Sequence, residues 1–188
     1  MGSMTLPPGD AIPIPRTTAS MPCLGYGVYK IPPSASKEAC LTAIEAGYRH
    51  IDCAQLYRSE SQVGDAVGES PVPRDQVFLT TKIKKVSGSE GSVYKQLLDS
   101  VRRIGGPDGY VDLFLIHTPR FNGGHTIRQV WEAMEKLHGE GRARAIGVSN
   151  FGIEHIKEMK AYAAIWPPHV NQIEVRPTVP WGSSQFSY

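Results

Sequence analysis

The sequence predicts an α/β protein in which strands and helices alternate around a parallel sheet. Three observations support this fold class. From residue 23 onward, short runs of Val, Ile, Leu and Phe alternate with longer stretches of helical periodicity, as in repeated strand and helix units. The short runs are almost continuously apolar, which is typical of strands buried on both faces. Glycine, serine and proline stand where these segments would begin or end.

Six apolar runs are predicted to be the strands of this sheet. Each has the length of a strand and is rich in Val, Ile, Leu or Phe, residues that fit a buried, pleated surface. In chain order the predicted strands are residues 23–28, 50–54, 77–83, 111–117, 143–149 and 170–175.

Three helices are predicted between these strands. Residues 34–47 open with a Ser beside Pro33 and end in a Gly, which are common helix start and stop signals. The other two helices carry apolar residues at the i, i+3, i+4, i+7 spacing of a packing face. These stripes are Val93, Leu97, Val101 and Ile104, and Ile127, Val130, Trp131, Met134 and Leu137.

One domain, residues 23–177, is predicted to contain all of these elements. The preceding residues 1–22 are rich in proline and predict either a short hairpin or an irregular arm. Residues 1–3 resemble an expression scar and are left out of the fold prediction. Residues 178–188 show neither helical nor strand periodicity, so we expect an irregular C-terminal tail.

The composition narrows the functional classes. A chain of 188 residues with 40% hydrophobic and 20% charged residues is ordinary for one soluble domain. Its net charge of +2 comes without a run of like charges, so neither nucleic acid nor a membrane surface is an expected partner. No apolar run is long enough to cross a bilayer, and no signal-peptide pattern opens the chain. Three cysteines without a CxxC pair favour reduced thiols and a cytoplasmic protein.

Polar residues recur at the carboxyl ends of the predicted strands. Asp52, Lys82 and His117 fall near the ends of the second, third and fourth strands, and Ser149 and Asn150 at the end of the fifth. Functional side chains gather at this rim in parallel sheets that are wrapped by helices. Each residue alone has a structural explanation, such as a turn cap, a solvated strand end or a core histidine. Four consecutive strands that deliver polar groups to one rim predict a site.

Together with Tyr57, these groups predict a site for proton transfer. A tyrosine hydroxyl titrates near pH ~10 when unperturbed, and a nearby Lys82 ammonium is expected to lower that pKa. Asp52 would keep Lys82 charged. His117 would donate a hydrogen bond to a carbonyl oxygen and stabilise negative charge there.

The ordered motifs of the chain resemble those of the aldo-keto reductase family. A set of motifs in a fixed order is far more specific than one short pattern. The matching stretches read LGYGVYK, GYRHIDCAQLY, LTTK, DLFLIH, GVSNF and NQIE, at residues 24–30, 47–57, 79–82, 112–117, 147–151 and 171–174.

The resemblance implies a (β/α) TIM-type barrel that is incomplete, with about six of eight strand and helix units, in a C-terminally truncated member. By position, Tyr57 would be the general acid, Lys82 the group that tunes its pKa, Asp52 the partner of Lys82, and His117 the residue that orients the carbonyl. The expected substrate is a small carbonyl compound.

The resemblance also implies NADPH as the cofactor. Ser149, Asn150 and Gln172 would hold the nicotinamide carboxamide, and Gly27 would line the mouth of the site. The family regions that hold the cofactor phosphates have no counterpart before residue 188, and the chain has no other phosphate-binding motif. The cofactor prediction is therefore NADPH or none.

Three functional hypotheses remain open. The first is NADPH-dependent carbonyl reduction. The second is a dehydratase, isomerase, cyclase or lyase that reuses the same four residues without a nicotinamide. The third is an inactive or regulatory truncated product. Because an incomplete barrel exposes two sheet edges, we expect a homodimer that covers them, with closure by the C-terminal tail as the alternative.

Other features of the sequence bear on the site. The histidines are scattered without ligand spacing, so no metal site is predicted. Cys53 is expected to be an inert strand thiol rather than a nucleophile. Residues 120–125, with their Asn-Gly-Gly segment, are expected to form a short loop beside an open substrate mouth.

Overall fold

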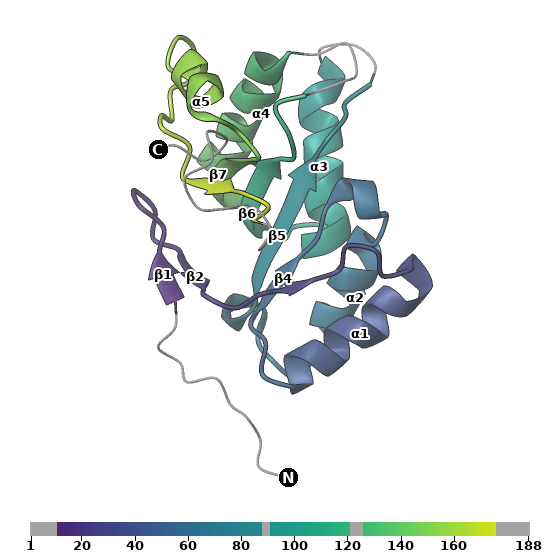
Figure 1. Ribbon diagram of the computed structural model, residues 1–188. Coiled ribbons are helices and arrows are strands. Elements are labelled where there is room, and N and C mark those ends of the chain that lie inside the picture. Colours follow the sequence, from purple (N-terminus) through teal and green to yellow (C-terminus); the bar gives the residue numbers. More distant parts are fainter. Residues whose placement is uncertain (1–10, 88–90, 121–125, 176–188) are drawn as a thin grey trace.

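The computed structural model describes residues 11–87, 91–120 and 126–175 (Figure 1). Its main feature is a sheet of six parallel strands in the order β3-β4-β5-β6-β7-β8. The predicted α/β class and the six predicted strands are confirmed. The strands are β3 (Tyr26–Gly27), β4 (His50–Asp52), β5 (Phe78–Ile83), β6 (Val111–Ile116), β7 (Ala143–Ser149) and β8 (Val170–Gln172).

The two outer strands are shorter than the sequence predicts. The run 23–28 contributes only Tyr26–Gly27 to β3, and the run 170–175 contributes only Val170–Gln172 to β8. Each of these strands pairs on one side only, so fewer ladder hydrogen bonds hold its ends in register. The central strands β5 and β6 are buried along their whole length.

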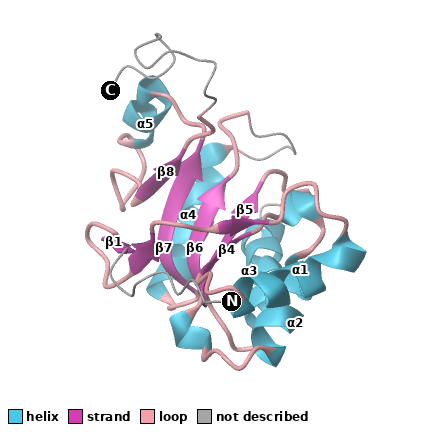
Figure 2. Cartoon of the chain, turned by 60° about the horizontal axis from the view of Figure 1, so that its bottom comes forward, coloured by secondary structure: helices cyan, strands magenta, loops and turns pink. Residues whose placement is uncertain are grey.

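Among the described residues, five α-helices lie on one side of the sheet (Figure 2). The three predicted helices are confirmed, although α1 begins and ends slightly earlier than expected. Two helices, α2 and α5, were not predicted. The helices are α1 (Pro33–Glu45), α2 (Glu60–Glu69), α3 (Gly91–Gly105), α4 (Ile127–Gly139) and α5 (Ile153–Met159).

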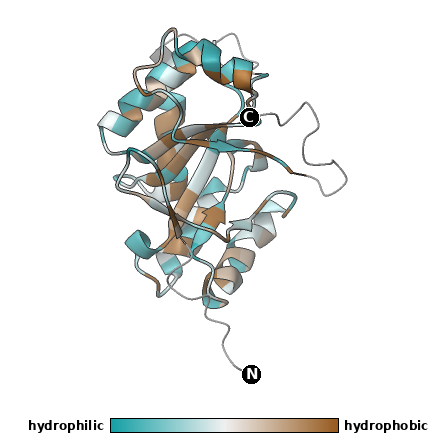
Figure 3. Ribbon diagram, turned by 60° about the vertical axis from the view of Figure 1, so that its left-hand side comes forward, coloured by the Kyte–Doolittle hydropathy of each residue, from teal (hydrophilic) through white to brown (hydrophobic). Residues whose placement is uncertain are grey.

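Side chains of the central strands alternate between two hydrophobic clusters. Phe114 and Ile116 of β6 belong to the large cluster between sheet and helices, whereas Leu113 and Leu115 belong to a smaller cluster on the opposite face. Successive residues of a strand point to opposite faces. In Figure 3 brown segments occur in the sheet, and the helices mix teal and brown along their length.

The smaller cluster is covered by a hairpin. Strand β1 (Ala11–Pro13) pairs antiparallel with β2 (Ser20–Pro22), so the described part of the N-terminal arm takes the hairpin form. Ile14 and Ala19 of its turn are buried in the cluster. The Arg16 guanidinium also donates to the carbonyl oxygen of Trp166 at 2.9 Å, which joins the hairpin to the segment before β8.

The sheet curves but does not close within the described residues. Its edges are β3 and β8, and the interior between them holds a hydrogen bond of 2.9 Å from Gln172 Nε2 to Asp52 Oδ2. The structure therefore corresponds to about six of the eight units of a (β/α)8 barrel. The predicted tail, residues 178–188, lies outside the described part of the chain.

Candidate active site

The four residues predicted for proton transfer line one cleft of about 460 Å³. Asp52 ends β4, Lys82 lies in the last part of β5, and His117 directly follows β6. Tyr57 ends the short 3-10 helix η1 (Gln55–Tyr57) that follows β4. Parallel register brings these carboxyl ends to one rim, so the topology gathers residues that are 65 positions apart, from 52 to 117.

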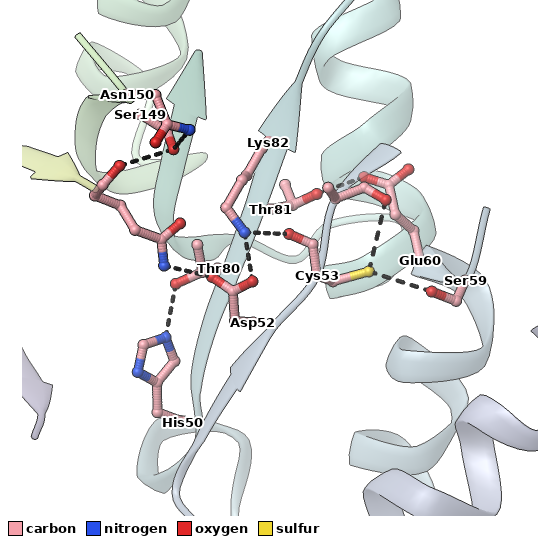
Figure 4. A network of polar contacts seen from close by, with 12 residues as sticks. His50, Asp52, Cys53, Ser59, Glu60, Thr80, Thr81, Lys82, Ser149 and Asn150 are labelled. Carbon is pink, nitrogen blue, oxygen red and sulfur yellow. Dashed lines mark hydrogen bonds and ion pairs between the residues drawn. The ribbon is translucent and has the colours of Figure 1, made fainter. Parts of the chain in front are cut away.

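The Lys82 ammonium and the Asp52 carboxylate face each other in a polar network (Figure 4). The Lys82 side chain is 4% exposed, and its ammonium donates to Asp52 Oδ1 and, at 3.2 Å, to the Cys53 carbonyl oxygen. The second Asp52 oxygen accepts from Gln172. Burial of a charge is costly unless the charge is paired, and here the carboxylate balances the ammonium.

Tyr57 lies among aromatic rings and beside the Lys82 ammonium. The Lys82 nitrogen is 5.6 Å from the Tyr57 ring centroid, and the Tyr29 and His117 ring centroids are 5.1 and 5.8 Å from it. Burial, followed by the charge of Asp52, raises the pKa of Tyr57. The sequence-based expectation of a lowered pKa is wrong for this state of the site, because Asp52 balances Lys82 and burial disfavours the phenolate. Tyr57 therefore keeps its proton at neutral pH.

His117 is neutral at physiological pH. Burial lowers its pKa to about 4, assisted by the positive charges of Lys82 and Lys84, while Asp52 acts in the opposite direction. Its Nδ1 atom is buried and has no hydrogen-bond partner among the described residues. A neutral imidazole carries one N–H donor, so this ring can donate a hydrogen bond without carrying charge into the cleft.

Ser149, Asn150 and Gln172 line the same cleft from the ends of β7 and β8. Ser149 Oγ donates to the Gln172 carbonyl oxygen at 2.8 Å, and Asn150 Nδ2 donates to Ser149 Oγ at 3.1 Å. Asn150 has a φ of 59°, a left-handed conformation that Asn tolerates better than most residues. These hydroxyl and amide groups form a connected polar wall of the cleft.

Gly27 does not line this cleft. It lines a neighbouring cavity of about 470 Å³ on the inner side of the sheet, which shares Asp52 and Gln172 with the cleft as a common wall. A Cβ atom added at Gly27 would meet no atom within 4 Å. Gly27 pairs with Asp52 in the sheet, and its role at the mouth of the site stays a prediction.

Sequence reasoning missed several cleft residues. Tyr29, Leu56 and Ile173 add apolar surface, and Lys84 and Glu174 add opposite charges. A signal for Lys84 was present in the sequence, because this second cation directly follows the strand that carries Lys82. The predicted substrate loop is described only at Arg120.

The described residues contain no group of three or more His, Cys, Asp and Glu side chains that could hold a metal ion. No described helix is long and apolar enough to cross a membrane.

Comparisons with known proteins identify relatives of the chain. The model of the Aldo/keto reductase family matches residues 23–184. Morphine 6-dehydrogenase from Pseudomonas putida is 41% identical over 157 residues, covering 84% of this chain and 52% of that protein. Glycerol 2-dehydrogenase (NADP(+)) from Saccharomyces cerevisiae is 34% identical over 191 residues, covering 88% and 60%.

Solved structures agree with these matches. An aldo/keto reductase from Brucella melitensis is 37% identical with a TM-score of 0.76, covering 87% of this chain and 63% of that one. A Bombyx mori aldo-keto reductase in complex with NADP is 32% identical with a TM-score of 0.76, covering 88% and 58%. The chain thus spans between about half and two thirds of the length of these relatives.

Proposed function

This chain belongs to the aldo-keto reductase family of oxidoreductases, and we propose that it reduces the carbonyl group of a small molecule with NADPH. The observation that carries the proposal is the convergence of Tyr57, His117 and the Lys82–Asp52 pair on one cleft. These groups come from three strand ends and one following turn. Tyr57 supplies a proton donor, His117 a neutral hydrogen-bond donor, and Lys82 a positive charge that Asp52 balances.

In the proposed reaction, Tyr57 and His117 act on the carbonyl oxygen. His117 donates a hydrogen bond that orients the carbonyl and stabilises negative charge on its oxygen. When bound, NADPH supplies a hydride that reduces the carbonyl carbon. The carbonyl oxygen takes its proton from the Tyr57 hydroxyl, and the nearby Lys82 ammonium stabilises the phenolate that remains. Asp52 keeps Lys82 charged and fixed.

The described residues fit the nicotinamide end of the cofactor. Ser149, Asn150 and Gln172 offer hydroxyl and amide groups that complement a carboxamide, which both donates and accepts hydrogen bonds. In this structure these groups bond to one another and to Asp52. Binding would exchange those bonds for bonds to the cofactor, so the proposed role requires Gln172 to release Asp52.

A cofactor-independent reaction is the second candidate. The observation that favours it is the hydrogen bond from Gln172 to Asp52. This bond occupies the Gln172 side chain, which would otherwise bind the nicotinamide, and ties it to the acid-base residues. Enolisation or loss of water from a carbonyl compound needs Tyr57, Lys82 and His117 but no change of redox state. Under the third hypothesis, an inactive or regulatory product, neither cofactor binding nor turnover is expected.

NADPH titration separates these candidates. We expect NADPH to bind, seen as a change in its fluorescence, and to be oxidised when aldehydes are added. Tyr57→Phe removes the proton donor but keeps the ring, so it should lower turnover by about 10²- to 10⁴-fold while NADPH still binds. Turnover of a carbonyl compound in the absence of NADPH would favour the second candidate, and absence of both binding and turnover would favour the third.

We also propose that two copies associate. Strands β3 and β8 are edges of the sheet. A groove of about 460 Å³ beside α1 is lined by Tyr26, Tyr48, Glu38 and small residues, mostly alanines. Unpaired edges are usually covered in native proteins. Sedimentation equilibrium should give twice the chain mass. A monomer at micromolar concentration would contradict the proposal.

A cytoplasmic location is proposed from the three thiols. Cys40 and Cys53 are buried and Cys23 is exposed, and all three are free cysteines. Free thiols persist in a reducing compartment. Detection of the protein in a periplasmic or secreted fraction would contradict this location.

A further inference from the structure

Lys84 places a cation in the proposed active site that the reduction mechanism does not use. It lines the cleft together with Tyr57 and His117 and follows Lys82 by two residues. Lys84 is exposed. Its ammonium makes no hydrogen bond and no ion pair within the described part of the chain, whereas Lys82 is fully engaged with Asp52 and Cys53.

The other charges around the cleft leave the His117 side positive. Lys82 and Lys84 lower the pKa of His117 and Asp52 raises it. Because Lys82 and Asp52 balance each other, Lys84 is the uncompensated charge among these three. Glu174 brings a carboxylate to the cleft from the β8 side. Lys30 adds a second cation above the exposed Tyr29 ring, at 5.5 Å from its centroid.

Apolar surface accompanies this charge. Tyr29, Leu56 and Ile173 line the cleft, and Tyr29 and Leu56 are large side chains with 62% and 49% exposure. Exposed apolar side chains that surround a few polar groups are typical of a small-molecule site. The cleft thus combines an apolar wall, a carbonyl-binding pair and one unpaired ammonium.

We propose that the substrate is a carbonyl compound bearing a carboxylate, with an apolar or aromatic body, and that Lys84 selects it by pairing with the carboxylate. This inference rests on the proposed carbonyl reduction and adds the substrate class. Lys84 is a specificity residue: it holds the far end of the substrate while Tyr57 and His117 act on the carbonyl oxygen. An ammonium and a carboxylate attract strongly in a partly desolvated cleft.

Matched aldehydes test the selectivity. The 2-, 3- and 4-formylbenzoates carry a carboxylate, and the corresponding formylbenzamides are neutral and nearly the same size. With NADPH, we expect at least one formylbenzoate to have a kcat/KM about tenfold or more above that of its amide. Lys84→Met should remove this preference, and Lys84→Glu should reverse it.

Lys85→Met provides the matched control. Lys85 is the exposed neighbour of Lys84 and does not line the cleft, so its substitution should keep the preference. Equal kcat/KM values for acid and amide in the native protein would overturn the inference. So would a preference that survives in Lys84→Met, or one that is lost equally in Lys85→Met.

A binding experiment separates this inference from the proposed reduction. Calorimetry with 4-(hydroxymethyl)benzoate and 4-(hydroxymethyl)benzamide, the two alcohol products, needs no turnover. The carboxylate should bind about tenfold more tightly, and Lys84→Met should remove the difference. Lys84→Met should also raise the pKa of His117 measured by NMR, because it removes a nearby positive charge. If no aldehyde is reduced but these two results hold, the reduction proposal fails and the carboxylate site stands; equal binding of acid and amide overturns the site.

Discussion

At the scale of single residues, the Lys82–Asp52 pair couples the stability of the protein to its proposed chemistry. Asp52→Asn would leave the Lys82 ammonium buried without a counter-charge. We expect a loss toward the lower end of about 3–5 kcal/mol of unfolding free energy, because Asp52 itself is 17% exposed. Urea unfolding measures it.

Asp108→Asn is the control for that substitution. The Asp108 side chain is 99% exposed and lies 3.7 Å from Arg142, and such exposed pairs contribute little. A loss in Asp52→Asn no larger than in Asp108→Asn would contradict the view that Asp52 neutralises a buried charge.

Two histidines, His117 and His169, make the free energy of unfolding depend on pH. Burial lowers the pKa of His117 and of His169 to about 4, below the unfolded value of about 6.5. The unfolded chain therefore binds protons that the folded chain excludes, so stability is full above about pH 6.5 and falls as the pH drops toward 4. Urea unfolding at several pH values should show this loss, and His169→Gln should reduce its slope. A flat profile from pH 6.5 to 4.5 would contradict it.

At the scale of elements, Glu60 fixes α2 against α3 and β5. Its carboxylate is 3% exposed, accepts from Thr81 Oγ1 at 2.7 Å and from Arg103 Nε at 2.9 Å, and also accepts from Ser100. Glu60→Ala would leave these donors without an acceptor, so we expect a loss of about 3–5 kcal/mol of unfolding free energy. Thermal and urea unfolding measure it.

The control is Glu69→Ala, at the exposed end of the same helix. Glu69 pairs only with the half-exposed Lys37, so its loss should cost about 1 kcal/mol or less. Similar losses for Glu60→Ala and Glu69→Ala would show that the buried network does not hold α2 in place.

The two helices that the sequence failed to predict, α2 and α5, were obscured by different features. Helix α2 contains Gly64 and Gly68, and glycine weakens a helix interior. Yet a Cβ at Gly64 would lie 2.7 Å from the Arg103 carbonyl oxygen, so close packing of α2 on α3 requires glycine at position 64. The same glycine weakens the helical pattern of the sequence. Helix α5 has only seven residues, too few for a clear helical periodicity.

At the scale of the whole molecule, the N-terminal hairpin completes the core on the inner face of the sheet. Ile14 is 3% exposed against Phe78, Leu113 and Leu115. Ile14→Ala should therefore cost about 2–5 kcal/mol of unfolding free energy, measured by urea unfolding. Ile12→Ala, on the same hairpin at 55% exposure, should change stability by about 0.5 kcal/mol or less. Equal effects would mean that the hairpin does not pack on the sheet in solution.

The sequence by itself determined which runs form the sheet and which polar residues lie near the carboxyl ends of the strands. Contiguous apolar runs encode buried strands locally, and parallel topology then brings Asp52, Lys82 and His117 to one rim. Only the tertiary structure decided the protonation states and the charge balance of the site. Burial and charges from distant segments raise the pKa of Tyr57 and leave the charge of Lys84 uncompensated. The hydrogen bond between Asp52 and Gln172 joins residues 120 positions apart. No local sequence pattern encodes these effects.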